Sequence, residues 1–362
     1  MPSRTKKLLR SLLLASLTLA FTGFFVGFLL AQSKAGSDAG TRPDAGKEAH
    51  KGPPPVPSPP PAFDDVPVPD DNPTTPEKVA LGKRLFFDKR LSGDGSRSCY
   101  SCHVCEKGLT DGLPTAVGAF DKILTRSSPT LWNIGYHDTF YWDGRSDSLE
   151  KQGMAAWKGA NMGADPEAVV KQVNEIEGYA KRFGKVFGGS ATPENVVKAL
   201  SAFERTIFCG ATRYDKFEQG EESALSDDEK RGYELFRGKA GCGTCHAGIL
   251  FTDLLFHNVG IGMDVENPDI GRKKVTEKEA DTGAFKTPTL RDISRSAPYF
   301  HDGSAATLAD AVETMAGGGK PNPYLDKTNL QDHKLTAQEK TDLVSFLTSL
   351  DCPCDLKEPK LP

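Results

Sequence analysis

The stretch CYSCH at residues 99–103 returns as CGTCH at residues 242–246, so one five-residue pattern occurs twice in the chain. Two cysteines separated by two residues reach the two vinyl groups of one porphyrin from a single helical turn. The histidine that follows then lies beneath the iron, and the pattern is typical of covalently attached c-type haem. The sequence therefore predicts two haem c groups, with thioether bonds to Cys99, Cys102, Cys242 and Cys245 and with His103 and His246 as iron ligands.

Three other kinds of site use closely spaced cysteines. A thioredoxin-like dithiol needs a βαβ context and has no role for the histidine. A four-cysteine zinc site places its two pairs about 15 to 20 residues apart, far closer than residues 99 and 242. Cys105 extends the first motif to the opening of a bacterial iron–sulfur run, but Leu109 and Thr110 stand where a cysteine and a proline belong. Haem attachment is the interpretation that uses both histidines.

The sequence around the two motifs is also repeated. GKRLFF (82–87) precedes the first motif and GYELF (232–236) precedes the second. PTLWNIGYHDTFYWDGRSDSL (129–149) follows the first, and PTLRDISRSAPYFHDGSAATL (288–308) aligns with it without a gap. Similarity on both sides of both motifs indicates a duplicated domain.

Helix signals dominate the remaining sequence. Thr75-Pro76, Ser226-x-x-Glu229 and Thr336-x-x-Glu339 are typical helix starts, and residues 167–187 and 195–208 are rich in helix formers. Few segments look like strands. We predict an all-α fold of two tandem cytochrome c-like domains, each with one covalently attached haem. The expected boundaries are 75–213 for the N-terminal domain, 214–351 for the C-terminal domain and 352–362 for a tail.

The first 74 residues are not expected to contribute to either core. Residues 11–31 carry no charge and follow a basic start, which predicts a signal peptide or, because the run is long and lacks an A-x-A site, an N-terminal membrane anchor. Residues 32–74 are rich in Pro, Ala and Gly and predict an extended linker. The rest of the chain is then exported, and we expect it in the bacterial periplasm. If residues 11–31 are an anchor, they tether it to the inner membrane.

Composition narrows the class of partner. The 362 residues are 38% hydrophobic and 26% charged, which is typical of globular protein, and the formal net charge is -4. No basic cluster interleaved with aromatic residues stands out, so a nucleic-acid partner is not expected.

A set of motifs occurs along the chain in the order C-x-x-C-H, P-T-L, W-D-G-R, the second C-x-x-C-H, FTDLLFHNVGIG, TPTLRDISRSAPYFHDG and VETM. In these motifs and their order the chain resembles the dihaem cytochrome c peroxidase family, which includes the MauG enzymes. The resemblance covers about residues 75–350. It implies that the C-terminal haem receives electrons and that the N-terminal haem on His103 is the peroxide site. It also implies that Met315 is the second iron ligand of the C-terminal haem, where MauG enzymes carry Tyr.

Further residue roles follow from the same resemblance. Trp142 corresponds to a tryptophan that lies between the two haems and relays an electron, and Gln152 corresponds to a glutamine of the peroxide pocket. His301 is expected to hydrogen-bond near the haems rather than to ligate iron. Ser127, with the backbone carbonyls of Ser296 and Pro298, would match the ligands of a calcium ion that some members bind between the domains.

The sequence departs from the family pattern in two places. Many members carry a histidine in the loop after the first haem that ligates the resting iron, but the matching stretch here is VGAFDKIL (117–124). The first site is then open without reductive activation, unless His137 compensates. The family also uses a glutamate about ten residues after the glutamine, and Ala160 or Asn161 stands at that point. Neither moves a proton, and Asp165 and Glu167 are out of register and start the next helix.

The resemblance thus implies an oxidoreductase, a peroxidase that reduces hydrogen peroxide to water with electrons from a small cytochrome c or a cupredoxin. Two alternatives stay open: a MauG-like oxidase of a partner protein, which an open site favours and Met315 opposes, and a non-enzymatic dihaem electron carrier. A homodimer is one possible assembly. Four cysteines outside the motifs allow disulfides in an oxidising compartment, but their pairing does not follow from the sequence. These cysteines are Cys105, Cys209, Cys352 and Cys354.

Overall fold

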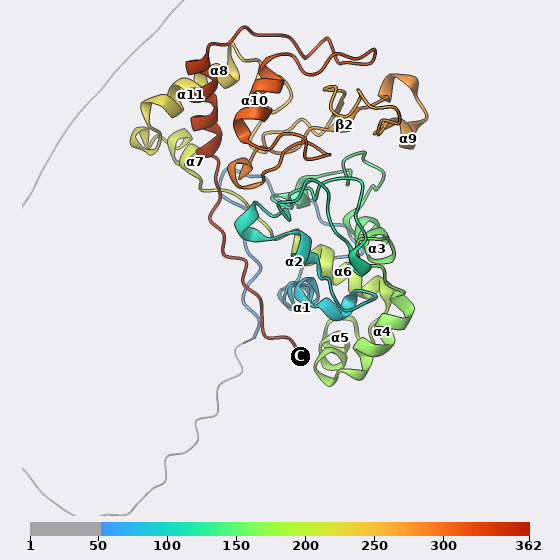
Figure 1. Cartoon of the computed structure of the whole chain (residues 1–362). Coiled ribbons are helices and arrows are strands. Elements are labelled where there is room, and N and C mark those ends of the chain that lie inside the picture. Colours follow the sequence, from blue (N-terminus) through green and yellow to red (C-terminus); the bar gives the residue numbers. More distant parts are fainter. Residues whose placement is uncertain (1–51) are drawn as a thin grey trace, which may run out of the picture. The chain divides into compact units, whose positions relative to one another are not determined.

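The computed structural model describes residues 52–362, so the predicted signal or anchor segment at 11–31 and the first part of the linker lie outside the described residues. The helices are α1 (Pro76–Phe87), α2 (Cys99–Cys102), α3 (Leu149–Lys158), α4 (Pro166–Glu175), α5 (Glu177–Phe187), α6 (Pro193–Glu204), α7 (Arg213–Glu218), α8 (Asp227–Arg237), α9 (Lys273–Thr276), α10 (Leu308–Ala316) and α11 (Ala337–Thr348). Figure 1 shows α8, α10 and α11 gathered in one region and α1 to α6 in another.

The expected helix starts are confirmed. Thr75 caps α1 by accepting a hydrogen bond from the backbone N–H of Lys78. Capping boxes begin α8 at Ser226 and α11 at Thr336. These signals are local, because a cap side chain bonds to backbone groups only two or three residues away. The caps therefore determine where these helices begin, independently of tertiary contacts.

The same helix crossing occurs on both sides of the repeat. α1 packs against α6 and α8 packs against α11. At each crossing a glycine allows close approach: a Cβ on Gly82 would lie 1.9 Å from the Ala199 carbonyl oxygen, and one on Gly232 would lie 2.0 Å from that of Asp342. Phe203 and Phe346 each lie next to their glycine, so α6 and α11 occupy equivalent places.

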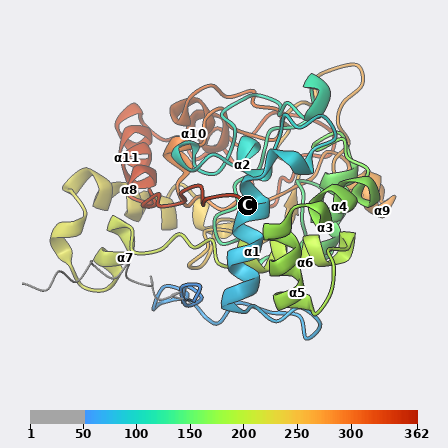
Figure 2. The ribbon, with the colours of Figure 1, turned by 90° about the horizontal axis from the view of Figure 1, so that it is seen from below.

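Two hydrophobic clusters surround these crossings. The first draws on α1, α5 and α6, for example Leu85, Phe183 and Phe203, and Cys99 packs against it. The second is built around Phe346 of α11, with Cys242 packed against it. Each C-x-x-C-H motif therefore lies beside one of the two cores. Figure 2 shows the helices around the first core, α1, α2 and α6, and those around the second, α8 and α11.

The expectation of an all-α fold needs one correction. Strands β1 (Phe256–His257) and β2 (Phe285–Lys286) pair antiparallel, with Phe256 opposite Lys286. The fold is mostly helical with one two-stranded sheet. A pair of two-residue strands carries too little alternation to be recognised from sequence, since a strand signal needs about four residues.

Residues 52–75 contain no helix or strand, yet several of them contact the folded core. The Phe63 ring lies 5.0 Å from the guanidinium of Arg291, and Asn72 is fully buried and donates a hydrogen bond to the Lys198 carbonyl. The end of the predicted linker is thus held against the core rather than extended from it. None of the helices in residues 52–362 combines the length and the hydropathy needed to cross a membrane.

The tail after α11 is attached to the first half of the chain by two disulfides. Cys352 pairs with Cys209, and Cys354 pairs with Cys105. Their Cα atoms are 5.4 and 5.8 Å apart, within the usual range for a disulfide. The tail then continues past α1 (Figure 1). The guanidinium of Arg90 donates to the backbone oxygen of Pro362 at 3.2 Å.

Candidate functional site

Each motif opens onto a cavity. The first has a volume of about 980 Å³, at the upper end of the range for cofactor sites, and Cys99, Cys102 and His103 lie in its wall. The second is smaller, about 240 Å³, and is lined by Cys242, Cys245, His246 and Met315 among mostly apolar groups. The structure thus places Met315 in the same cavity as His246.

The two motif histidines are held in the form that binds a metal. Nδ1–H of His103 donates to the Leu109 carbonyl at 3.0 Å, and Nδ1–H of His246 donates to the Phe251 carbonyl at 3.1 Å. Burial lowers the pKa of His103 to about 4 and also lowers the pKa of His246. Both imidazoles are therefore neutral at physiological pH, and the Nε2 lone pair of each is available to bind a metal ion.

The cysteines divide into two sets. The four outside the motifs form the two disulfides, and the free cysteines of the described residues are the four that belong to the motifs. Burial raises the pKa of Cys102 and of Cys242 to about 11, so these thiols carry no negative charge. Paired free thiols beside a neutral histidine in the lining of each cavity fit the donor set that haem c requires.

Trp142 lies in a wall that the two cavities share. Its indole N–H donates to the Ser127 carbonyl at 3.0 Å, and its own carbonyl accepts from the backbone N–H of Lys286 at 2.8 Å. Ser127 and Lys286 line both cavities as well. The ring is thus held between the two cavities, and its role as an electron relay stays a prediction.

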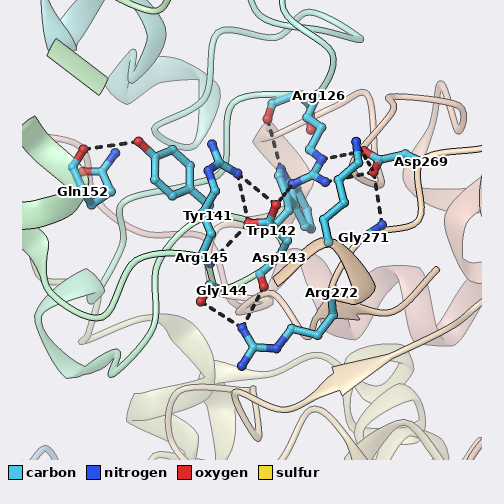
Figure 3. Close-up of polar contacts among 12 residues, drawn as sticks. Arg126, Tyr141, Trp142, Asp143, Gly144, Arg145, Gln152, Asp269, Gly271 and Arg272 are labelled. Carbon is cyan, nitrogen blue, oxygen red and sulfur yellow. Dashed lines mark hydrogen bonds and ion pairs between the residues drawn. The ribbon is translucent and has the colours of Figure 1, made fainter. Parts of the chain in front are cut away.

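Charged side chains from both halves clamp the turn that follows Trp142. Arg126 bonds to Asp143 at 2.7 Å and to Asp269 at 2.6 Å, and Arg145 approaches Asp143 from the other side at 2.9 Å. Arg272 donates to the carbonyls of Asp143 and Gly144, as Figure 3 shows. Nearly buried ion pairs with several hydrogen bonds hold their partners rigidly, so this clamp fixes the position of the turn.

His301 is buried next to this wall. Its imidazole stacks on Phe285 with ring centroids 3.7 Å apart, and Trp142 meets it edge-on at 6.5 Å. Burial lowers its pKa to about 4, so the ring is neutral. The structure places His301 in the lining of the second cavity beside Trp142.

Gln152 and Asn161 both line the first cavity. Gln152 lies on α3, and its backbone carbonyl accepts a hydrogen bond from the Tyr141 hydroxyl at 3.2 Å (Figure 3). Asn161 follows α3, and its carbonyl accepts from the N–H of Ala119. The loop that lacks the family histidine is thereby attached to the cavity wall. Asp165 caps α4 through the N–H of Glu167, as expected from the sequence.

His137 also reaches the first cavity. Its Nδ1 lies 3.3 Å from the ammonium nitrogen of Lys286, and burial together with that charge lowers the pKa of His137 to about 3. Lys286 is itself buried, which lowers its pKa to about 8.

Two residues of the site were missed in the sequence. Glu204 on α6 is 7% exposed and lines the first cavity, and burial raises the pKa of its carboxyl to about 8. Leu200, one turn earlier on α6, lines the same cavity, so the helical spacing could have indicated that Glu204 faces it as well. Arg126, in contrast, has no local signal, because its partner Asp269 is distant in the chain.

The three predicted calcium ligands lie in the wall of the second cavity. The Ser127 hydroxyl donates to the Phe300 carbonyl at 2.9 Å and the Ser296 hydroxyl to the Ile293 carbonyl at 3.1 Å. No carboxylate belongs to this set, whereas calcium sites usually include one. Calcium at Ser127, Ser296 and Pro298 stays a prediction.

Known proteins resemble this chain over most of its length. The family model described as di-haem cytochrome c peroxidase matches residues 76–223. The methylamine utilization protein MauG of Methylorubrum extorquens is 40% identical over 77% of this chain and 79% of its own. The cytochrome c551 peroxidase of Nitrosomonas europaea is 39% identical over 77% and 81%. The crystal structure of a MauG-like protein associated with microbial copper homeostasis superimposes with a TM-score of 0.76 at 32% identity, covering 83% of this chain and 96% of that one.

Proposed function

Since this chain belongs to the di-haem cytochrome c peroxidase family, we propose that it reduces hydrogen peroxide to water with electrons from a small c-type cytochrome or a cupredoxin. We place this activity in the bacterial periplasm, because the two disulfides are typical of an oxidising compartment outside the cytosol. The nearly equal identities to a MauG protein and to a peroxidase do not separate the two activities. The site has to do so.

The observation that carries the proposal is Met315 in the cavity of His246. A haem held at the His103 site would supply peroxide reduction, and one held by His246 and Met315 would supply electron uptake, since His/Met ligation raises the potential. Trp142, in the shared wall, is positioned to couple the two sites. Its hydrogen bond to Ser127 and the clamp on Asp143 hold the ring in one orientation.

Residues of the first cavity bind and orient the small substrate. The Gln152 side chain offers an amide donor and acceptor on the α3 wall, and Asn161 offers a second amide but no acidic proton. These two amides can orient peroxide but carry no acidic proton, so the proton would have to come from another group of the cavity, such as Glu204. A MauG-like oxidase is the second candidate, and the loop 117–124 without histidine favours it.

The function is tested by mixing the half-reduced protein with one equivalent of hydrogen peroxide in a stopped-flow spectrometer, followed by steady-state turnover with a reduced small cytochrome. Oxidation of both haems and sustained turnover are expected. Haem content, measured as the pyridine haemochrome, should be two per chain. A protein with two haems that neither reacts with peroxide nor turns over would overturn the proposal in favour of an electron carrier or an oxidase of a protein partner.

Asn161→Glu is expected to accelerate the peroxide reaction, because it restores an acid in the cavity wall. General acid–base catalysis contributes about 10²–10⁴-fold, so a rise of roughly tenfold or more is expected even with imperfect placement. The backbone bond from Ala119 to residue 161 is kept in this variant. Asn161→Gln, with a similar length and no acidic proton, is the control. Equal rates in the two variants would show that the proton moves elsewhere in the cavity.

A further inference from the structure

The helices that follow the repeated segments are equivalent in the two halves. The alignment of residues 129–149 with 288–308 leads directly into α3 and α10, which begin at Leu149 and Leu308. Both are capped by a hydroxyl residue, Ser148 or Thr307, that accepts from the N–H three residues on. α3 packs against α6 just as α10 packs against α11.

The two helices also face their cavities with the same positions. Every residue of α10 that lines the second cavity has its counterpart 159 residues earlier on α3, and that counterpart lines the first cavity. The pairs are Leu149 with Leu308, Gln152 with Ala311, Gly153 with Val312, Ala156 with Met315 and Trp157 with Ala316. The correspondence therefore extends from the sequence to the side chains exposed inside each cavity.

Within this shared frame one difference concerns a metal ligand. Where α10 presents the Met315 thioether to its cavity, α3 presents the methyl group of Ala156. A methyl group has no lone pair, and it occupies much less space than a methionine side chain. One turn earlier the difference has the other sense: α3 presents the polar side chain of Gln152 to the first cavity, whereas the equivalent residue of α10 is Ala311. The first cavity thus loses an internal ligand and gains a hydrogen-bonding amide.

We infer that Ala156, together with the loop 117–124 that lacks a histidine, keeps the iron at the His103 site open to a small external ligand, and that the same helix position decides which of the two sites takes substrate. This inference builds on the proposed function, because it names where peroxide gains access. It depends directly only on haem binding at both motifs. Together with Gln152, Ala156 favours a small polar molecule such as peroxide over a bulky one.

The test is Ala156→Met, read from the electronic absorption and electron paramagnetic resonance spectra of the resting protein. The variant is expected to convert the first haem from high spin to a low-spin state like that of the second. It should also weaken cyanide binding by at least about tenfold, since a ligand within the chain competes at high effective concentration. Ala155→Met, one residue away on the exposed face of α3, is the matched control and should leave both spectra unchanged.

Ala156→Leu separates ligation from crowding, because leucine fills similar space without a thioether. We expect it to weaken cyanide binding while the first haem remains high spin. Spectra of Ala156→Met that match the parent protein, or identical spin states in the Met and Leu variants, would overturn the inference. A failure of the proposed function is distinguishable: a parent protein without peroxide turnover in which Ala156→Met still changes the spin state would contradict the peroxidase and leave this inference standing.

Discussion

The Met315→His variant is expected to keep two haems per chain and to lose most of its turnover with a cytochrome donor. Histidine still ligates iron, but exchanging His/Met for His/His ligation lowers the midpoint potential of the second haem, by on the order of 100 mV. Since about 59 mV is a tenfold change for one electron, the equilibrium for electron uptake shifts roughly 50-fold against the enzyme. Spectroelectrochemical titration and steady-state turnover measure the two effects together.

Met154→His is the matched control for this change. Met154 packs at the edge of the first core and lies outside the linings of both cavities. Its replacement should leave both potentials in place. An unchanged potential in Met315→His would show that the second iron takes its ligand from another residue, and the argument for a peroxidase over a MauG-like oxidase would lose its support.

Replacing Cys209 and Cys352 together by alanine is expected to lower the free energy of unfolding by about 3–4 kcal/mol. The bond closes a loop across 143 residues, so its loss returns considerable freedom to the unfolded chain. Both cysteine residues are buried, at 0% and 2% exposure, and alanine leaves no unpaired hydroxyl there. Denaturant titration followed by far-UV circular dichroism measures the change.

The pair Cys105 and Cys354 provides the comparison, since it links the same tail to the same half of the chain. Its replacement by alanine is expected to destabilise by a similar amount. Reductant should have no further effect on a variant that lacks all four of these cysteines. A denaturation midpoint that is unchanged after loss of Cys209 and Cys352 would mean that the buried contacts around them hold the tail without the bond.

Those contacts connect both halves to the tail. The Trp132 indole donates to Asp292 at 2.8 Å, and the other carboxylate oxygen of Asp292 accepts from the N–H of Cys352 at 2.9 Å. The amide of Asn133 exchanges two hydrogen bonds with the backbone of Cys209. A fully buried carboxylate with such partners is well satisfied, and breaking the set exposes several groups at once.

Predictions from the sequence succeeded where the determining interaction is local. The caps at Thr75, Ser226 and Thr336 use neighbouring backbone groups, and α1, α8 and α11 begin where those signals stand. The C-x-x-C-H motifs carry their geometry within five residues. Their cysteines and histidines accordingly line the expected cavities.

Features that depend on distant segments could not be predicted in the same way. Four cysteines outside the motifs allow three pairings, and only the folded chain selects one. The contact of Phe63 with Arg291 lies in a stretch whose composition indicates an extended spacer, and β1 and β2 are too short to leave a pattern. No sequence pattern indicates the ion pair of Arg126 with Asp269 either.

The internal repeat contains more information than a motif search extracts. Aligned as far as Leu149 and Leu308, the two halves predict a duplicated domain. Continued by two turns of helix, the alignment also compares Ala156 with Met315. The roles assigned to Trp142, Gln152 and Asn161 stay predictions, but all three side chains lie in the wall of the first cavity.

The disulfide pattern also imposes an order on the maturation of the protein. Cys209 and Cys105 lack their native partners until the segment after α11 has been synthesised, because they pair with Cys352 and Cys354. Meanwhile the thiols at Cys99 and Cys102 emerge beside Cys105, and a premature bond among them would block the thioether positions. With haem c attached to Cys99 and Cys102 as proposed, attachment before oxidation would protect these two thiols, and the tail cysteines would close the molecule last.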